Sequence, residues 1–173
     1  YYPFYMLLGH LAPPDLITFN AARVVIAALL AWALWRLIAE ILPAPIERRV
    51  AFTLALLGLG LGWPTLFGGL GGVIRPTDIL APTSTLFGAA ILNPHFPLAA
   101  ALQFVTLALY LRAQRKPYRA GTLPLGALAC LTVGLLVPYH LVVVGVILLT
   151  DVIAARRHRA AFFILLPSTA GAV

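Results

Sequence analysis

The sequence predicts an all-α fold, a polytopic transmembrane helix bundle with a re-entrant or interfacial segment on the non-cytoplasmic side. Of the 173 residues, 62% are hydrophobic and only 10% are charged, whereas a water-soluble domain carries about 25% charged residues. The apolar residues are gathered in runs, several of them close to the roughly 20 residues that cross a bilayer. Clusters of Lys and Arg separate these runs, as they do in the cytoplasmic loops of membrane proteins.

The whole chain, residues 1–173, is expected to form one transmembrane domain with about five full or short spans and a partial span at each end. Tyr1–Leu11 lacks the basic start of a signal peptide and a cleavage site after it. This stretch is therefore expected to be the last part of a span. Ala160–Pro167 is apolar but stops short of a crossing, so the chain is expected to be a fragment of a longer polypeptide.

Apolar runs in the first two thirds of the chain predict three spans. Thr18–Leu42 is long enough to cross and ends at the prolines of Pro43-Ala44-Pro45. Ala51 to about Phe67 forms the second run, and Pro97–Leu111 forms the third.

The run from Thr122 to Ala155 is too long for one span, because about 34 helical residues would extend roughly 50 Å. Pro138 stands near its middle, where a proline interrupts the hydrogen bonding of a helix. We therefore expect a hairpin of two short spans, Leu123–Val137 and Leu141–Ala155.

With this hairpin, every basic cluster can be placed on the cytoplasmic side of a plasma (inner) membrane. The clusters are Arg48 and Arg49; Arg112, Arg115, Lys116 and Arg119; and Arg156, Arg157 and Arg159. Membrane topology and anionic lipid headgroups explain the net charge of +7 better than nucleic-acid binding does.

The segment Gly68–Phe96 then falls on the non-cytoplasmic side. It is too rich in glycine and proline for a span, and too apolar for a free loop. Such backbone is tolerated at membrane depth only when protein or water surrounds it, which favours a segment folded back onto the membrane surface.

Four polar residues on this side are candidate site residues, each with a plainer alternative. Arg75 and Asp78 either pair at the surface, or Arg75 binds a ligand phosphate through its planar guanidinium. His95 either lies in the first turn of a helix after a proline, or binds phosphate or acts as an acid or base. His140 either anchors the hairpin tip at the interface or joins the same site.

Other polar residues are assigned to structure. Arg36 and Glu40 are four residues apart and are expected to pair on one helix face. Asp151 is expected to meet a basic neighbour near the cytoplasmic end of its span. Cys130 is the lone cysteine, so the chain has no disulfide and no cysteine-based spacing for a metal or haem.

Several short stretches, in their order along the chain, resemble the multi-spanning GT-C glycosyltransferases and their bacterial relatives. They are Tyr5–Ala12, Phe19–Arg23, Leu59–Trp63, Thr85–Phe87, Asn93–Phe96 and Gly134–His140. The resemblance covers most of the chain and implies transfer of a sugar from a polyprenyl-phosphate donor at the non-cytoplasmic face.

The resemblance also implies roles for residues. Arg75, His95 and His140 would bind the phosphate of the lipid-linked sugar donor, where cations stabilise a departing phosphate. The family's catalytic carboxylate usually lies in an outer loop upstream of this chain, which leaves Asp78 as the candidate within the segment. The resemblance allows a divalent cation as cofactor, and we assign no metal ligand. Expected partners are membrane lipids, the donor and other membrane subunits, without nucleic acid.

Two other functions fit the same composition. A non-catalytic helical subunit of a larger photosynthetic or respiratory complex needs only apolar spans and anchors, and it needs no carboxylate. A fragment of a transporter would also contain helices broken by glycine and proline.

Overall fold

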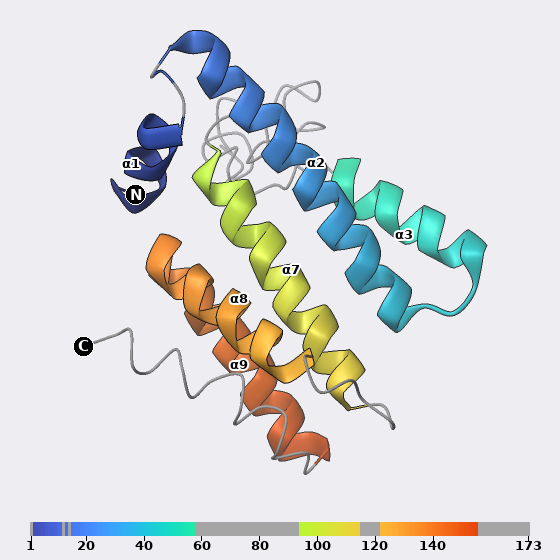
Figure 1. Cartoon of the computed structure of the whole chain (residues 1–173). Helices are drawn as coiled ribbons and strands as arrows, with labels where there is room; N and C mark the ends of the chain where they lie inside the picture. The colour runs from blue at the N-terminus through green and yellow to red at the C-terminus, as the bar shows by residue number, and fades with distance from the viewer. Residues whose placement is uncertain (1, 12, 14, 58–93, 115–121, 156–173) are drawn as a thin grey trace, which may run out of the picture.

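The protein is described by a computed structural model that places residues 2–11, 13, 15–57, 94–114 and 122–155. These residues form helices joined by short connections, without a strand among them, which confirms the all-α prediction for this part of the chain. The helices are α1 (Tyr2–Leu11), α2 (Leu16–Ile41), α3 (Pro45–Leu57), α7 (His95–Ala113), α8 (Thr122–Leu136) and α9 (Pro138–Ala155) (Figure 1).

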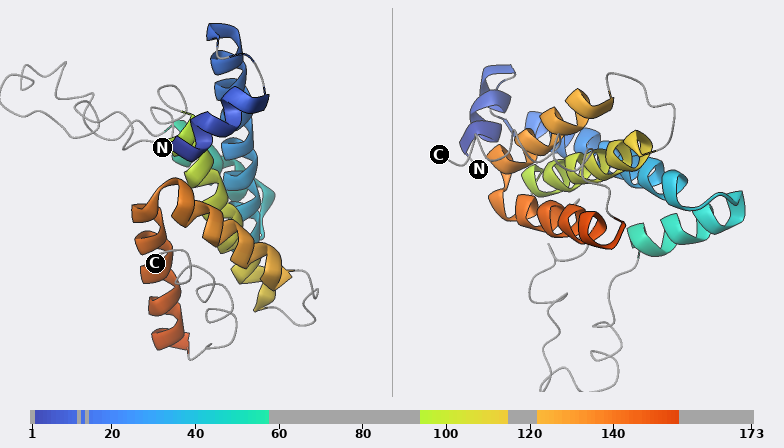
Figure 2. Two further views of the ribbon diagram at one scale, coloured as in Figure 1. Left: turned by 60° about the vertical axis from the view of Figure 1, so that its left-hand side comes forward. Right: turned by 90° about the horizontal axis from the view of Figure 1, so that it is seen from below.

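Helix α7 is the centre of this arrangement. It packs along α2 on one side and along α8 on the other, and α9 packs against both α8 and α7 (Figures 1 and 2). Within the described residues, α2 and α7 are long and apolar enough to cross a membrane, judged by length and composition. Helices α8 and α9 are apolar but shorter than this criterion requires.

Local sequence features set the two ends of α2: a capping aspartate at the start and a proline just after the end. The side chain of Asp15 accepts a hydrogen bond from the backbone N–H of Thr18 at 2.7 Å, which satisfies one of the unpaired donors of the first turn. The helix ends at Ile41, two residues before Pro43, because a proline disfavours helical backbone in the residue before it. Its 26 residues extend about 39 Å, more than the about 30 Å of a hydrocarbon core.

The prediction that a loop carries Arg48 and Arg49 is wrong, because α3 begins at Pro45 rather than near Ala51. Proline suits the first helical position, where a missing N–H costs nothing. Glu47 in the first turn adds a favourable charge at the helix N-terminus. The two arginines therefore lie within a helix. The rest of the expected span, beyond residue 57, lies outside the described residues.

The predicted break at Pro138 is confirmed: α8 ends at Leu136 and α9 starts at Pro138. The backbone N–H of Val137 still bonds to the carbonyl of Val133 at 2.9 Å, but Pro138 has no N–H to continue the series. At this corner the two helices come close together. A Cβ atom added to Gly134 would lie 3.3 Å from Leu141.

Two buried clusters hold the helices together. Between α2 and α7 the cluster is made largely of alanines, which lets two helix backbones approach closely, as is common between membrane helices; its members are Leu30, Ala33, Ala100 and Ala101. Between α7, α8 and α9 the cluster consists of Leu107, Tyr110, Cys130, Val144 and Leu148. Large apolar side chains such as Ile17, at 80% exposure, cover the outer faces.

Candidate functional site

His95 is the first residue of α7, as its position between two prolines predicts. The carbonyl of Pro94 accepts the backbone N–H of Leu98 at 3.2 Å, which closes the first turn. Pro97 is also buried in this turn, where the first N–H groups of a helix have no partner within it. The prolines therefore remove no hydrogen bond of the helix here, and they fix His95 as the first residue of α7.

The side chain of His95 is 6% exposed and lies against α1. Its Nδ1 is 3.0 Å from the hydroxyl of Tyr5, and the two rings meet edge to face with their centroids 5.6 Å apart. The ring of Phe96 covers it at 4.2 Å. His95 is therefore a point where α1 and α7 are joined, as well as the start of a helix.

His140 is the third residue of α9 and faces α7. Its Nδ1 lies 2.7 Å from Oε1 of Gln103, so Nδ1–H donates to the amide oxygen. Gln103 is 8% exposed, and a buried amide requires such a partner. The expectation that His140 only anchors the hairpin tip at the interface did not include this bond between helices.

We call Tyr5, His95, Gln103 and His140 the histidine end of the bundle. His95 and Gln103 are eight residues apart on α7, or about 12 Å along its axis. The two histidines are therefore held by different partners, two turns apart. Imidazole and phenol groups can donate and accept hydrogen bonds, and imidazole can transfer a proton near neutral pH.

The other two predicted site residues, Arg75 and Asp78, lie outside the described residues.

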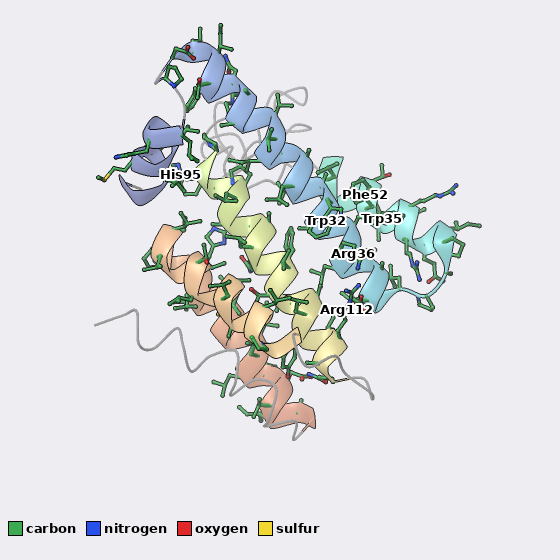
Figure 3. The ribbon with its side chains drawn as sticks, in the orientation of Figure 1. Trp32, Trp35, Arg36, Phe52, His95 and Arg112 are labelled. Carbon is green, nitrogen blue, oxygen red and sulfur yellow. The ribbon has the colours of Figure 1, made fainter. Side chains whose placement is uncertain are left out.

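The opposite end of α7 carries charge. Arg112 donates from Nε to Oε1 of Glu40 and forms an ion pair between α7 and α2, with side chains 40% and 8% exposed respectively. Arg36 lies one turn before Glu40 on α2, in the neighbourhood of Arg112 (Figure 3). The expectation that Glu40 pairs along its own helix thus missed its partner on the neighbouring helix.

Arg48 joins α3 to the end of α2. Its Nε donates to the carbonyl of Leu42 at 2.6 Å, and its Nη2 donates to the carbonyl of Pro43 at 2.9 Å. A cation is favourable at a helix C-terminus, where carbonyls are unpaired and the helix dipole is negative. We call Arg36, Glu40, Arg48, Arg49 and Arg112 the arginine end of the bundle.

Asp151 of α9 is held at the same end. Its Oδ2 accepts the hydroxyl of Tyr110 at 2.5 Å and the side-chain amide of Gln114 at 2.9 Å. The expectation of a basic neighbour did not anticipate these neutral donors from α7. The C-terminal end of α7 is therefore bonded to two helices. Arg112 binds Glu40 of α2, while Tyr110 and Gln114, on either side of it in the sequence, bind Asp151 of α9.

Sequence reasoning missed Tyr5 and Gln103 as members of the site. A usable signal was present for Gln103, because a polar side chain inside an apolar run is costly and usually faces another helix. Tyr5 gave no such signal, since tyrosines are common at membrane interfaces without a specific partner.

Comparison of the chain with protein-family models, with curated proteins and with solved structures gives no match. The chemistry of the histidine end and the arginine end is therefore the basis on which a function can be assigned.

Proposed function

We propose that this chain is a polytopic membrane protein with its arginine end on the cytoplasmic side. The supporting observation is the bond set that joins the last turns of three helices. Arg112 binds Glu40 of α2, and Tyr110 and Gln114 bind Asp151 of α9. Each basic cluster lies at or directly after one of these ends in the sequence, which agrees with the enrichment of Lys and Arg on the cytoplasmic side.

The histidine end then belongs to the non-cytoplasmic side, because α7 runs the length of the bundle between the two ends. At this level we propose a site for a lipid-linked sugar donor, in a protein similar to the GT-C glycosyltransferases. His95 begins α7 on this side, and His140 of α9 bonds to α7 two turns further along. Hydrogen-bond donors there, together with Arg75 from the preceding segment, would stabilise the charge on a departing lipid phosphate.

The test measures transfer of sugar from a radiolabelled polyprenyl-phosphate donor by the full-length protein in membranes. Arg75→Ala and His95→Ala are expected to abolish transfer. His10→Ala is the matched control, because His10 is an exposed histidine whose bond among the described residues is local, to the carbonyl of Met6 at 2.7 Å. Turnover equal to that of the wild type in both site variants would refute the proposed roles.

A second candidate, the non-catalytic helical subunit, is favoured by the partners of the histidines. His95 and His140 each bind a side chain from another helix, which is the structural use of polar residues inside membranes. On this account the wild-type protein shows no transfer in intact membranes, while His140→Ala still lowers the melting temperature. Measurable transfer by the wild-type protein would exclude it.

A further inference from the structure

The length of α2 places its last turns outside the hydrocarbon core. Twenty residues, Leu16–Trp35, are enough to cross about 30 Å. The next six residues, from Arg36 to Ile41, would extend about 9 Å further, into the layer of lipid headgroups. This register rests on the membrane insertion proposed above. It puts Arg36 and the start of α3 where lipid phosphates lie.

Aromatic side chains mark the same level. Trp35 of α2 meets Phe52 of α3 edge to face at 5.5 Å, and Trp32 and Trp35 are 53% and 36% exposed. Figure 3 shows these rings between α2 and α3, with Arg36 and Arg112 beyond them toward the end of α2. Tryptophan gathers at the boundary between acyl chains and headgroups, so the rings and the arginines have the order expected on crossing that boundary.

Helix α3 carries a shallow groove at this corner. It encloses about 280 Å³ and is lined, among the described residues, by Arg49, Val50, Thr53 and Leu54. These positions are one turn apart on a single exposed face of α3. The surface of the groove is mainly apolar and Arg49 is exposed beside it, which suits an acyl chain whose phosphate lies next to that arginine.

Arg48 and Arg49 have different tasks. The two carbonyl bonds of Arg48 hold the turn between α2 and α3 in place. Arg49 is exposed beside the groove, and its guanidinium can bind phosphate oxygens with two parallel N–H groups. One arginine therefore positions the corner, and the next is available to a ligand.

We infer that the start of α3 binds the headgroup of an anionic phospholipid of the cytoplasmic leaflet, with Arg49 as its main contact. The negative charge of the lipid complements Arg49. Its acyl chains extend over Val50 and Leu54. Because the site is exposed, salt weakens the binding.

The experiment reconstitutes the full chain into vesicles of phosphatidylcholine with a rising fraction of phosphatidylglycerol. After mild detergent extraction, native mass spectrometry counts the retained lipids. The wild-type protein is expected to retain phosphatidylglycerol preferentially. Arg49→Gln is expected to reduce this preference about fivefold, the effect of one arginine at an anionic surface.

Arg23→Gln is the matched control, since Arg23 lies near the opposite end of α2 and bonds to Asn20. It should keep the preference of the wild type. An equal loss in Arg23→Gln and Arg49→Gln, or no loss in Arg49→Gln, would overturn the assignment while leaving membrane insertion intact. A chain that does not float with the vesicles would overturn both the lipid site and the proposed membrane function.

Discussion

The two ends of the bundle use different chemistry to join neighbouring helices to α7. At the histidine end, imidazole bonds to a phenol and to an amide. At the arginine end, Arg112 pairs with Glu40, and Asp151 accepts two neutral donors. Among these residues of α7 itself, His95 and Gln103 are almost fully buried, while the side chain of Arg112 is 40% exposed and its partner Glu40 on α2 is 8% exposed.

The difference shows how the two ends of one apolar helix can be held by different kinds of bonds, each suited to its surroundings. Carboxylates and guanidiniums are stable where water or headgroups reach them, because burying an unpaired charge is far more costly than burying an amide. Neutral groups can be buried when each has a partner. Helix α7 therefore has a charged end suited to an aqueous boundary, and a neutral end suited to a packed interior.

The largest expected effect is at the arginine end. Arg112→Met removes the ion-pair partner that α7 supplies to Glu40, whose side chain is only 8% exposed. A carboxylate left in that position should cost about 2 kcal/mol, less than a fully buried pair because Arg112 is partly exposed. Thermal unfolding in detergent measures the change.

The double variant Glu40→Gln with Arg112→Met should recover most of this loss, because it removes both charges together. Arg23→Gln is the control for loss of an arginine, because Arg23 bonds to Asn20 of its own helix, and its melting temperature should equal that of the wild type. A double variant as unstable as Arg112→Met would show that the ion pair is not what joins α2 to α7.

A smaller effect is expected at the histidine end. His140→Ala leaves the amide of Gln103 buried without this partner and should destabilise by about 1.5 kcal/mol. Replacing both residues by leucine should recover most of this loss, since both members of the hydrogen bond are then removed together. Unfolding of both variants in the same detergent gives the comparison. A double variant as unstable as the single one would contradict a role in joining α7 and α9.

The smallest effect concerns Asp15, which caps α2 at the histidine end but is fully exposed. The backbone N–H of Thr18 bonds to its carboxylate and lowers the pKa of that carboxyl below the usual value. The cap therefore stabilises fully above the ordinary aspartate pKa, and its contribution is lost as pH falls through the lowered value.

Asp15→Ala should melt slightly below the wild type at pH 7, and the gap should close as the pH is lowered into the acidic range. Asp15→Asn keeps a capping oxygen that does not titrate, so its own melting temperature should be free of this pH-dependent contribution. A constant gap for Asp15→Ala across the acid range would indicate that the carboxylate charge does not contribute.

Local features of the fold were predictable from sequence. The lengths of α2 and α7 follow from apolar runs, and the break at Pro138 and the start of α7 at His95 follow from prolines, all of which act on nearby backbone. The start of α3 at Pro45 was missed, because the apolar run begins only at Ala51.

The partners at the two ends could not be predicted in the same way. Tyr5 is 90 residues from His95, Glu40 is 72 from Arg112, and Gln103 is 37 from His140. Such pairs depend on how whole helices pack, which one sequence does not specify by spacing. The four-residue spacing of Arg36 and Glu40 predicts an ion pair along α2, and this spacing gives no indication that Glu40 also pairs with a residue of α7.

The most direct test of the account asks whether the two ends lie on opposite sides of a membrane. In a Cys130→Ala background, single cysteines at Pro13 and Glu47, both exposed, are treated with a membrane-impermeant maleimide. Pro13→Cys is expected to react in intact cells, and Glu47→Cys only after permeabilisation. Labelling of both cysteines from the same side would contradict the account.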